Sequence, residues 1–337
     1  MKRDRLWEVL RKTGVSSKFI KTLQAIYDNV RSRVRSGPDL SGAFECPIGL
    51  RQGCRLSPII FSLLINEVAD TIYREGGPGY QFRPGTIDIR ILMFADDITL
   101  IALTPRDLQI LINILDRVAS DLGLSVNLGK SKVIVFRKGG FLAARECWFL
   151  GQKCLETVNS YKYLGLTLTT KLSMKTALSE FVGRAKRKII DIHKLIHSIG
   201  YMSPQIYFKL IDSIVTPLAL YSAEVWGLRE TPEIESINTF ACKRMLGVTK
   251  RTPNCLVYGE LGRYPITITA KLRAVKYWLK ITEMDEERIP KLAYYRELME
   301  ENKKHNWARG VKQLLEENGF GFVWESQGVL YLSLIHI

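Results

Sequence analysis

The sequence lacks an apolar run long enough to cross a membrane. A membrane span needs about 18–20 consecutive apolar residues. The longest candidate, residues 210–226, contains Asp212, Pro217 and Glu224. We therefore expect this segment to lie in a buried core, and we expect no membrane partner.

Cysteine is scarce and wrongly spaced for a metal site. The six cysteines are scattered along the chain, and no two of them form the C-x2-C pair of a structural zinc site. A chain of this size can bury its own core and needs no disulfide framework. We therefore expect reduced thiols and an intracellular protein.

Acidic residues are clearly fewer than basic residues. The chain holds 49 Lys and Arg against 34 Asp and Glu, which gives a formal net charge of +15. Residues 1–35 alone hold ten basic side chains against three acidic ones. Because basic proteins release counterions when they bind phosphates, this imbalance favours a nucleic-acid partner over an anionic membrane.

The N-terminal residues predict two amphipathic helices followed by a strand. Asp4 and the Ser16–Ser17 pair stand where helix caps are expected. Arg31, Arg33 and Arg35 then alternate with small residues, which at strand period places the three guanidinium groups on one face. That face is either a nucleic-acid contact or a solvated edge strand.

A glycine-bounded loop at residues 49–53 precedes the next expected helix. Ser57 is its predicted N-cap and Pro58 its first helical residue. The pair Gly76–Gly77 is expected to end it.

The next part of the chain predicts a mixture of strands and helices. Residues 87–102 indicate a β-hairpin with two acids, Asp96 and Asp97, near its turn. A helix over 108–122 and a short strand over 133–136 follow, so the fold class is α/β or α+β.

From residue 172 onward the pattern becomes mainly helical. Apolar positions between Leu178 and Ile196 mark one face of a long helix. The basic residues that lie largely off this face are Arg184, Lys186, Arg187 and Lys188. They form either a phosphate-binding surface or an ordinary solvated one, and the change of pattern predicts a domain boundary near residue 170.

The pair Asp96–Asp97 is the main candidate for chemistry. An Asp pair in a hairpin turn usually has only a structural role, because Asp tolerates the tight backbone geometry of a turn. Here the pair lies between apolar strands, where acids are costly unless they pair or bind a cation. Carboxylates of this kind can hold Mg²⁺, which prefers oxygen ligands and shares its coordination with substrate phosphates.

Four segments together resemble the reverse transcriptase of non-LTR (LINE-type) retrotransposons. G-L-R-Q-G-C-R-L-S-P at 49–58 resembles motif B of that family, and F-A-D-D at 94–97 resembles motif C. G-L-S-V-N-L-G-K-S-K at 123–132 is similar to motif D, and Y-K-Y-L-G-L-T-L at 161–168 to the primer-grip motif E. Four motifs in the right order are far more specific than any one of them.

The resemblance implies an α+β fold of the right-hand polymerase type. A palm of antiparallel sheet with helices would be followed by a mainly helical thumb. We accordingly expect a partial palm with motifs B to E at 1–170, a helical thumb at 171–255 and a C-terminal helical region at 256–337.

The implied activity is that of an RNA-directed DNA polymerase, a nucleotidyltransferase. Its partners would be template RNA, primer DNA and deoxynucleoside triphosphates, with two Mg²⁺ ions clamping the attacking and leaving oxygens. A retroelement ribonucleoprotein would visit both the nucleus and the cytoplasm.

The resemblance also assigns roles to single residues. Asp96 would be the principal metal ligand and Asp97 its accessory partner. Lys130 would give a proton to the departing pyrophosphate. Residues expected at the template, nucleotide or primer end are Arg51, Gln52, Gly53, Phe94, Tyr163, Leu164 and Gly165. Residues expected to contact phosphates are Arg31, Arg33, Arg35, Arg184, Lys186, Arg187 and Lys188.

The first catalytic Asp of this family lies in motif A, upstream of the stretch that resembles residues 2–7. Since a two-metal site needs carboxylates from separate strands, we expect this chain to be inactive by itself. The alternative is a non-catalytic remnant that binds RNA or RNA–DNA hybrid. The final L-S-L-I-H-I resembles a translated sequencing adapter, so the last residues are expected to be an artefact.

Two further motifs are rejected on their sequences. Gly129-Lys130-Ser131 resembles the end of a phosphate-binding P-loop, but that pattern needs Gly at the position of Leu124. His193 and His197 have the spacing of a metalloprotease pair, yet Lys194 stands where the Glu is required. We expect these histidines on a helix surface.

Overall fold

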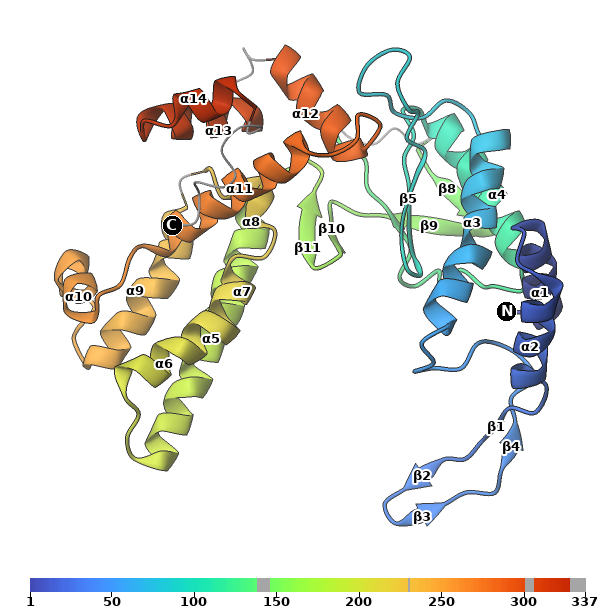
Figure 1. The fold of residues 1–337 in the computed structure, drawn as a ribbon, viewed down its shortest axis with the longest axis horizontal. Helices are drawn as coiled ribbons and strands as arrows, with labels where there is room; N and C mark the ends of the chain where they lie inside the picture. The colour runs from blue at the N-terminus through green and yellow to red at the C-terminus, as the bar shows by residue number, and fades with distance from the viewer. Residues whose placement is uncertain (138–145, 230, 301–305, 328–337) are drawn as a thin grey trace. The chain divides into compact units, whose positions relative to one another are not determined.

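The computed structural model describes residues 1–137, 146–229, 231–300 and 306–327. The chain forms two compact units, which we call unit 1 and unit 2 (Figure 1). Of the described residues, unit 1 contains Met1–Val135 and residues 146–158, and unit 2 consists mainly of the chain from Asn159 onward. The functional division at residues 170 and 255 stays a prediction.

In its described residues, unit 1 combines four helices with small sheets. The helices are α1 (Arg3–Lys12), α2 (Ser17–Asp28), α3 (Ser57–Glu75) and α4 (Pro105–Asp121). The strands are β1 (Arg31–Ser32), β2 (Arg35–Ser36), β3 (Asp39–Leu40), β4 (Phe44–Glu45), β5 (Ile91–Phe94), β6 (Asp97–Leu100), β7 (Lys132–Val133), β8 (Trp148–Leu150) and β9 (Lys153–Thr157).

The sheets of unit 1 are mostly antiparallel pairs. β1 pairs with β4, β2 with β3, and β5 with β6. In the three-stranded sheet, β9 lies between β7 and β8, parallel to β7 and antiparallel to β8. β7 ends at Val133, short of the strand predicted over 133–136, because Val133 pairs with Thr157, the last residue of β9.

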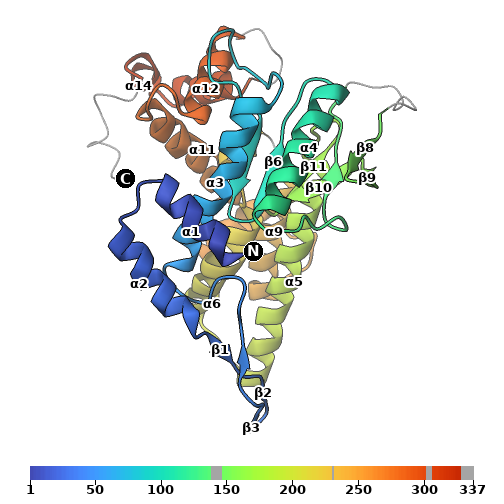
Figure 2. The same cartoon turned by 90° about the vertical axis from the view of Figure 1, so that its right-hand side faces the viewer.

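The core of unit 1 lies between α1, α2, α3, α4 and the β5–β6 hairpin. Leu64, Val68 and Ile72 recur every four residues on α3 and are fully buried. They belong to one cluster with Leu6 of α1 and Leu111 of α4. Figure 2 shows α1 lying against α3. The amphipathic pattern therefore places the apolar faces of these helices together.

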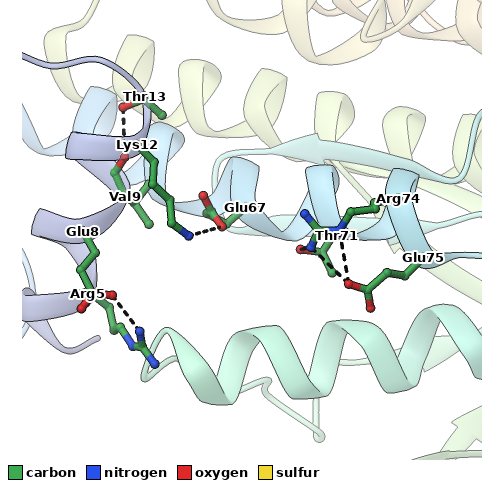
Figure 3. Close-up of polar contacts among 9 residues, drawn as sticks. All are labelled: Arg5, Glu8, Val9, Lys12, Thr13, Glu67, Thr71, Arg74 and Glu75. Atoms are coloured by element: carbon green, nitrogen blue, oxygen red, sulfur yellow. Dashed lines mark hydrogen bonds and ion pairs between the residues drawn. The ribbon is translucent and has the colours of Figure 1, made fainter.

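Surface ion pairs add little to this packing. Figure 3 shows Lys12 of α1 facing Glu67 of α3, with 3.7 Å between Nζ and Oε2. Arg5 and Glu8 form another exposed pair within α1, at 2.7 Å. Exposed pairs contribute about 0–1 kcal/mol each. The buried apolar side chains must therefore hold α1 in place.

The expected helix starts are only partly right. Ser16 caps α2, since its hydroxyl accepts a hydrogen bond from the Phe19 N–H at 3.3 Å. Asp4 is not a cap: α1 begins after Lys2, and Asp4 lies in the first turn. Ser57 is not the cap of α3 but its first residue, and its hydroxyl donates to the Arg51 carbonyl at 2.7 Å. Gly76 ends α3 as predicted.

The single arginine strand expected over residues 31–35 is wrong. Arg31 lies in β1 and pairs with Glu45, whereas Arg35 lies in β2 and pairs with Leu40. Arg33 lies between the two strands. Because the ladder is interrupted there, strand period does not place the three guanidinium groups on one face.

Unit 2 is mainly helical. Its one hairpin among the described residues is formed by β10 (Ser160–Tyr163) and β11 (Leu166–Thr169), and η1 (Ile211–Val215) is a π-helix. The α-helices are α5 (Lys175–Ile199), α6 (Pro204–Leu210), α7 (Thr216–Ala219), α8 (Ala223–Trp226), α9 (Pro232–Leu246), α10 (Asn254–Leu261), α11 (Ile266–Thr282), α12 (Ile289–Met299), α13 (Trp307–Glu317) and α14 (Gly321–Glu325).

The apolar run at 210–226 lies in the core of unit 2, as predicted. Its buried residues include Ile211, Val215, Leu220 and Trp226. Among the described residues, no helix is both long and apolar enough to span a membrane. Helices together with small antiparallel sheets confirm the α+β class.

The C-terminal region also packs within unit 2. The Trp278 ring of α11 stacks on Trp324 of α14, with 5.3 Å between ring centroids. The Trp278 indole N–H donates to the Tyr294 hydroxyl at 3.1 Å. Helices α11 to α14 lie within the helical region that was predicted over 256–337. The suspected adapter segment, residues 332–337, lies outside the described residues.

His193 is half-buried rather than on a helix surface. Its Nε2 lies 3.1 Å from the Tyr207 hydroxyl, and burial, followed by the charges of Arg244 and His197, lowers its pKa. His193 therefore binds a proton more readily in the unfolded chain than in the folded chain. The free energy of unfolding should accordingly fall as the pH drops below about 6.5. We expect His193→Gln to flatten the dependence of the urea midpoint on pH between about 5 and 7.

The control for this prediction is His197→Gln, because His197 is exposed on the same helix. It should reduce the pH dependence much less than His193→Gln, because the charge of His197 is the smallest of the three causes that lower the pKa of His193. An unchanged slope in His193→Gln would show that the folded state does not depend on neutral His193.

Candidate active-site segments

The β5–β6 hairpin presents its two carboxylates at the tip. Phe94 pairs with Asp97, so Ala95 and Asp96 are the two turn residues. Ala95 has φ +54°, a left-handed conformation that a residue with a Cβ rarely adopts. Ile91 is buried, whereas Phe94, Asp96 and Asp97 are exposed. The apolar strands thus anchor a tip whose acids reach solvent.

The donor set at this tip fits Mg²⁺. Carboxylate oxygens are its preferred protein ligands, and Mg²⁺ usually takes one or two carboxylates and keeps water or phosphate in its other positions. Asp96 and Asp97 are the acids available at the tip. No group of three or more His, Cys, Asp or Glu suited to a metal ion occurs among the residues that the structure describes.

Two hydroxyl groups support the loop that contains the motif B residues. Arg51, Gln52 and Gly53 are exposed, and Gly53 has φ +80°, which favours glycine. The Ser57 hydroxyl donates to the Arg51 carbonyl and lies 3.2 Å from the hydroxyl of buried Tyr27. The route from Tyr27 to the loop was not predicted from the sequence.

Arg3 fixes the segment that leads into this loop. Its guanidinium donates to the carbonyls of Gly49 at 3.1 Å, Tyr27 at 2.8 Å and Cys46 at 2.5 Å. It also lies 5.2 Å from the centroid of the Tyr27 ring. One side chain therefore ties α1, α2 and the approach to the loop together.

We expect Arg3→Met to destabilise the protein by about 1.5–3 kcal/mol, because a charged donor loses its hydrogen bonds to three carbonyls. Urea unfolding would measure this. Arg5→Met is the matched control, since Arg5 is exposed and forms an ion pair with exposed Glu8, and it should leave the stability almost unchanged. Equal effects of the two substitutions would contradict the role of Arg3.

The motif D segment is a turn organised by Asn127. The Lys130 N–H donates to the Asn127 side-chain oxygen at 3.1 Å, and the Ser131 N–H donates to the Asn127 carbonyl at 2.9 Å. Lys130 is exposed. The following element is strand β7 rather than a helix, so this segment is not a P-loop.

The motif E residues form the tip of the β10–β11 hairpin. Tyr163 pairs with Leu166, and the two turn residues between them, Leu164 and Gly165, have φ +46° and +84°. The Leu164 carbonyl accepts a hydrogen bond from the Tyr221 hydroxyl. This hairpin belongs to unit 2, whereas the other three motifs belong to unit 1.

The four predicted basic residues of α5 do not share one surface. Arg184, Arg187 and Lys188 line an open hollow of about 440 Å³ together with Lys194, which sequence reasoning missed. Lys186 instead lies over the Phe240 ring of α9, with Nζ 5.8 Å from its centroid. Three of the four, with Lys194, thus form what we call the basic face of α5.

The three arginines near the N-terminus lie on an exposed arm, residues 31–45 (Figures 1 and 2). Every residue of the arm except Ser32 is exposed. Arg31 pairs with Glu45 at 3.6 Å, from Nη2 to Oε1. The arm extends away from α1 and α2 and presents basic side chains to solvent.

Comparison with known proteins identifies similar sequences. Residues 2–168 match the family described as reverse transcriptase (RNA-dependent DNA polymerase). The chain is 25% identical over 242 residues to the retrovirus-related Pol polyprotein from the type-2 retrotransposable element R2DM of Drosophila melanogaster. It is 22% identical over 258 residues to the RNA-directed DNA polymerase from the mobile element jockey of Drosophila funebris.

These alignments cover 68% and 72% of this chain, but only 22% and 26% of the two Drosophila proteins. A transposon-derived protein of Caenorhabditis elegans is 27% identical over 164 residues, which cover 47% of this chain and 57% of that protein. The chain therefore spans about a quarter of the two longer relatives.

Proposed function

Because residues 2–168 belong to the reverse transcriptase family and the chain is similar to proteins of non-LTR retrotransposons, we propose that it is part of an RNA-directed DNA polymerase of a LINE-type retroelement. Unit 1 would carry palm motifs B to D, and unit 2 the primer grip and the thumb. The observation that carries the proposal is the apolar β5–β6 hairpin, which presents exposed Asp96 and Asp97 at its tip.

The reaction would join the primer 3′-hydroxyl to the α-phosphate of a deoxynucleoside triphosphate and release pyrophosphate. Asp96, in the turn, would hold the principal metal, and Asp97, the first residue of β6, would support it. Bound Mg²⁺ would activate the 3′-hydroxyl and stabilise the leaving oxygen. Lys130, at the end of the Asn127 turn, would give a proton to the pyrophosphate.

Other residues of the chain would hold the nucleic acid. Arg51, Gln52 and Gly53 would contact template and nucleotide, where glycine lets backbone and ligand approach closely. Phe94, 64% exposed beside the turn, would pack against the substrates. Tyr163, Leu164 and Gly165 would receive the primer end. Contacts from the arm and the basic face of α5 would go to phosphates and carry no sequence information.

We further propose that the chain by itself polymerises poorly. A two-metal centre needs carboxylates that converge from separate strands, and Asp96 and Asp97 are adjacent. The second candidate function is binding of RNA–DNA hybrid without catalysis. The basic face of α5 favours it, because this face needs no metal to bind phosphate.

Primer extension on a poly(rA) template with an oligo(dT) primer and Mg²⁺ tests these proposals. We would compare this chain with a form extended upstream in its reading frame. Polymerisation by the extended form alone supports the palm assignment. Hybrid binding by both forms without extension favours the binding function. Extension by this chain itself, lost in Asp96→Asn, would overturn the proposal of poor activity.

A further inference from the structure

The turn of the β10–β11 hairpin adopts a conformation that its own sequence does not favour. Both turn residues, Leu164 and Gly165, have positive φ. Two-residue turns of this kind favour Asn-Gly or Asp-Gly, because a leucine in the left-handed region places its Cβ too close to the backbone. Contacts from outside the hairpin are therefore needed to hold the turn.

Tyr221, in the segment between α7 and α8, makes these contacts. Its hydroxyl donates to the Leu164 carbonyl. Its ring lies against Gly165, where an added Cβ would stand 3.3 Å from ring atom Cε1 and 3.4 Å from Cζ. One side chain thus touches both residues of the turn.

Tyr221 is itself held firmly. Its carbonyl accepts a hydrogen bond from the Trp226 indole N–H at 2.9 Å, and its ring meets Phe181 edge to face, with 6.1 Å between centroids. The preceding carbonyl, of buried Leu220, accepts from the Arg273 guanidinium at 2.9 Å. Phe181 and Trp226 belong to the core of unit 2, so the position of the Tyr221 hydroxyl is set by that core.

The strands of the hairpin are held separately. The Thr167 hydroxyl donates to Glu180 of α5 at 2.8 Å, and Lys162 lies 4.0 Å from the same carboxylate. Glu180 therefore fixes the hairpin along its length, and Tyr221 fixes its tip. Removing the Tyr221 hydroxyl should release the tip while the strands stay in place.

We propose that Tyr221 is a positioning residue that sets the orientation of the motif E turn and, through it, the place of the primer 3′ end. The inference rests on the proposed function, in which Tyr163, Leu164 and Gly165 receive that end. Tyr221 acts on the primer through the Leu164 carbonyl and the Gly165 backbone.

The test uses the full chain and an RNA template annealed to a DNA primer that ends in 2-aminopurine, a base whose fluorescence rises when it unstacks. Tyr221→Phe keeps the ring and removes only the hydroxyl. At saturating protein we expect a changed fluorescence of the primer end, with the dissociation constant raised by about fivefold or less, the size of one lost hydrogen bond. Tyr201→Phe is the control, since Tyr201 is 76% exposed.

Gly165→Ala is a second variant that leaves the core of unit 2 untouched. Its new Cβ would meet the Tyr221 ring and would be strained at φ +84°, so it should change the fluorescence in the same way. Thermal melting of both variants should stay within a few degrees of the unmodified chain, which separates positioning from loss of fold.

The outcomes are distinguishable. Saturable binding with the same primer-end fluorescence in Tyr221→Phe, Gly165→Ala and the unmodified chain overturns the inference and leaves the proposed function standing. Absence of saturable hybrid binding by the unmodified chain overturns the proposed function, and the inference with it. A fluorescence change in Tyr221→Phe and Gly165→Ala, but not in Tyr201→Phe, supports both the inference and the proposed function.

Discussion

Primer extension by a polymerising form of this protein should fall by about a thousandfold in Asp96→Asn, because a metal ion contributes several kcal/mol to the transition state and each 1.36 kcal/mol is tenfold in rate. Asp96 is exposed in the turn of the β5–β6 hairpin, so its replacement should leave the melting temperature unchanged. The measurement is the initial rate of extension at saturating Mg²⁺ and nucleotide.

Two controls separate this effect from a general loss of charge. Asp97→Asn should lower the rate less than Asp96→Asn, since Asp97 would be the accessory ligand and Asp96 the principal one. Asp70→Asn, on the exposed side of α3, should leave the rate unchanged. Equal losses in Asp96→Asn and Asp70→Asn would remove the basis for a metal site at the hairpin tip.

Replacing Arg187, Lys188 and Lys194 together by Gln should weaken binding of RNA–DNA hybrid strongly. These side chains line the basic face of α5. Each phosphate contact that is lost lowers the slope of log K against log salt by about 0.7–0.9, so three contacts lower it by roughly 2–3. Fluorescence anisotropy between about 50 and 200 mM salt, a range over which affinity based on phosphate contacts falls steeply, would measure the affinity and the slope.

The matched control is Lys186→Gln. It removes a charge from the same helix, but the Lys186 ammonium lies over the Phe240 ring. We expect its salt slope to stay close to that of the unmodified chain. The opposite outcome is that Lys186→Gln lowers the slope of log K against log salt by as much per lost charge as the triple variant does. That result would mean that the net charge of α5, rather than one face of it, binds the hybrid.

Local patterns predicted much of the fold and of the candidate site. The apolar run around Asp96 and Asp97 predicted the β5–β6 hairpin, and the 3.6-residue period predicted α4 and α5. Ser16 capped α2 and Gly76 ended α3 as expected, because caps depend on residues a few positions apart. The four motifs could be read for the same reason: each is a short continuous segment.

What the sequence alone could not determine depends on residues far apart in the chain. Ser57 is the first residue of α3 rather than its cap, and its hydroxyl contacts Arg51 and Tyr27. The arginine strand is divided because Arg31 and Arg35 pair with different strands. Local preference is weak, and a tertiary partner overrides it.

The sequence by itself thus determined which segments are proposed to carry chemistry: the Asp96–Asp97 hairpin, the motif turns and the basic helix α5. Only the tertiary structure decided which side chains support them. Arg3 holds three distant carbonyls, Lys186 lies away from the basic face, and Tyr221 reaches the motif E turn. The physical reason is that these contacts form only when the helices pack, so no local period or spacing encodes them.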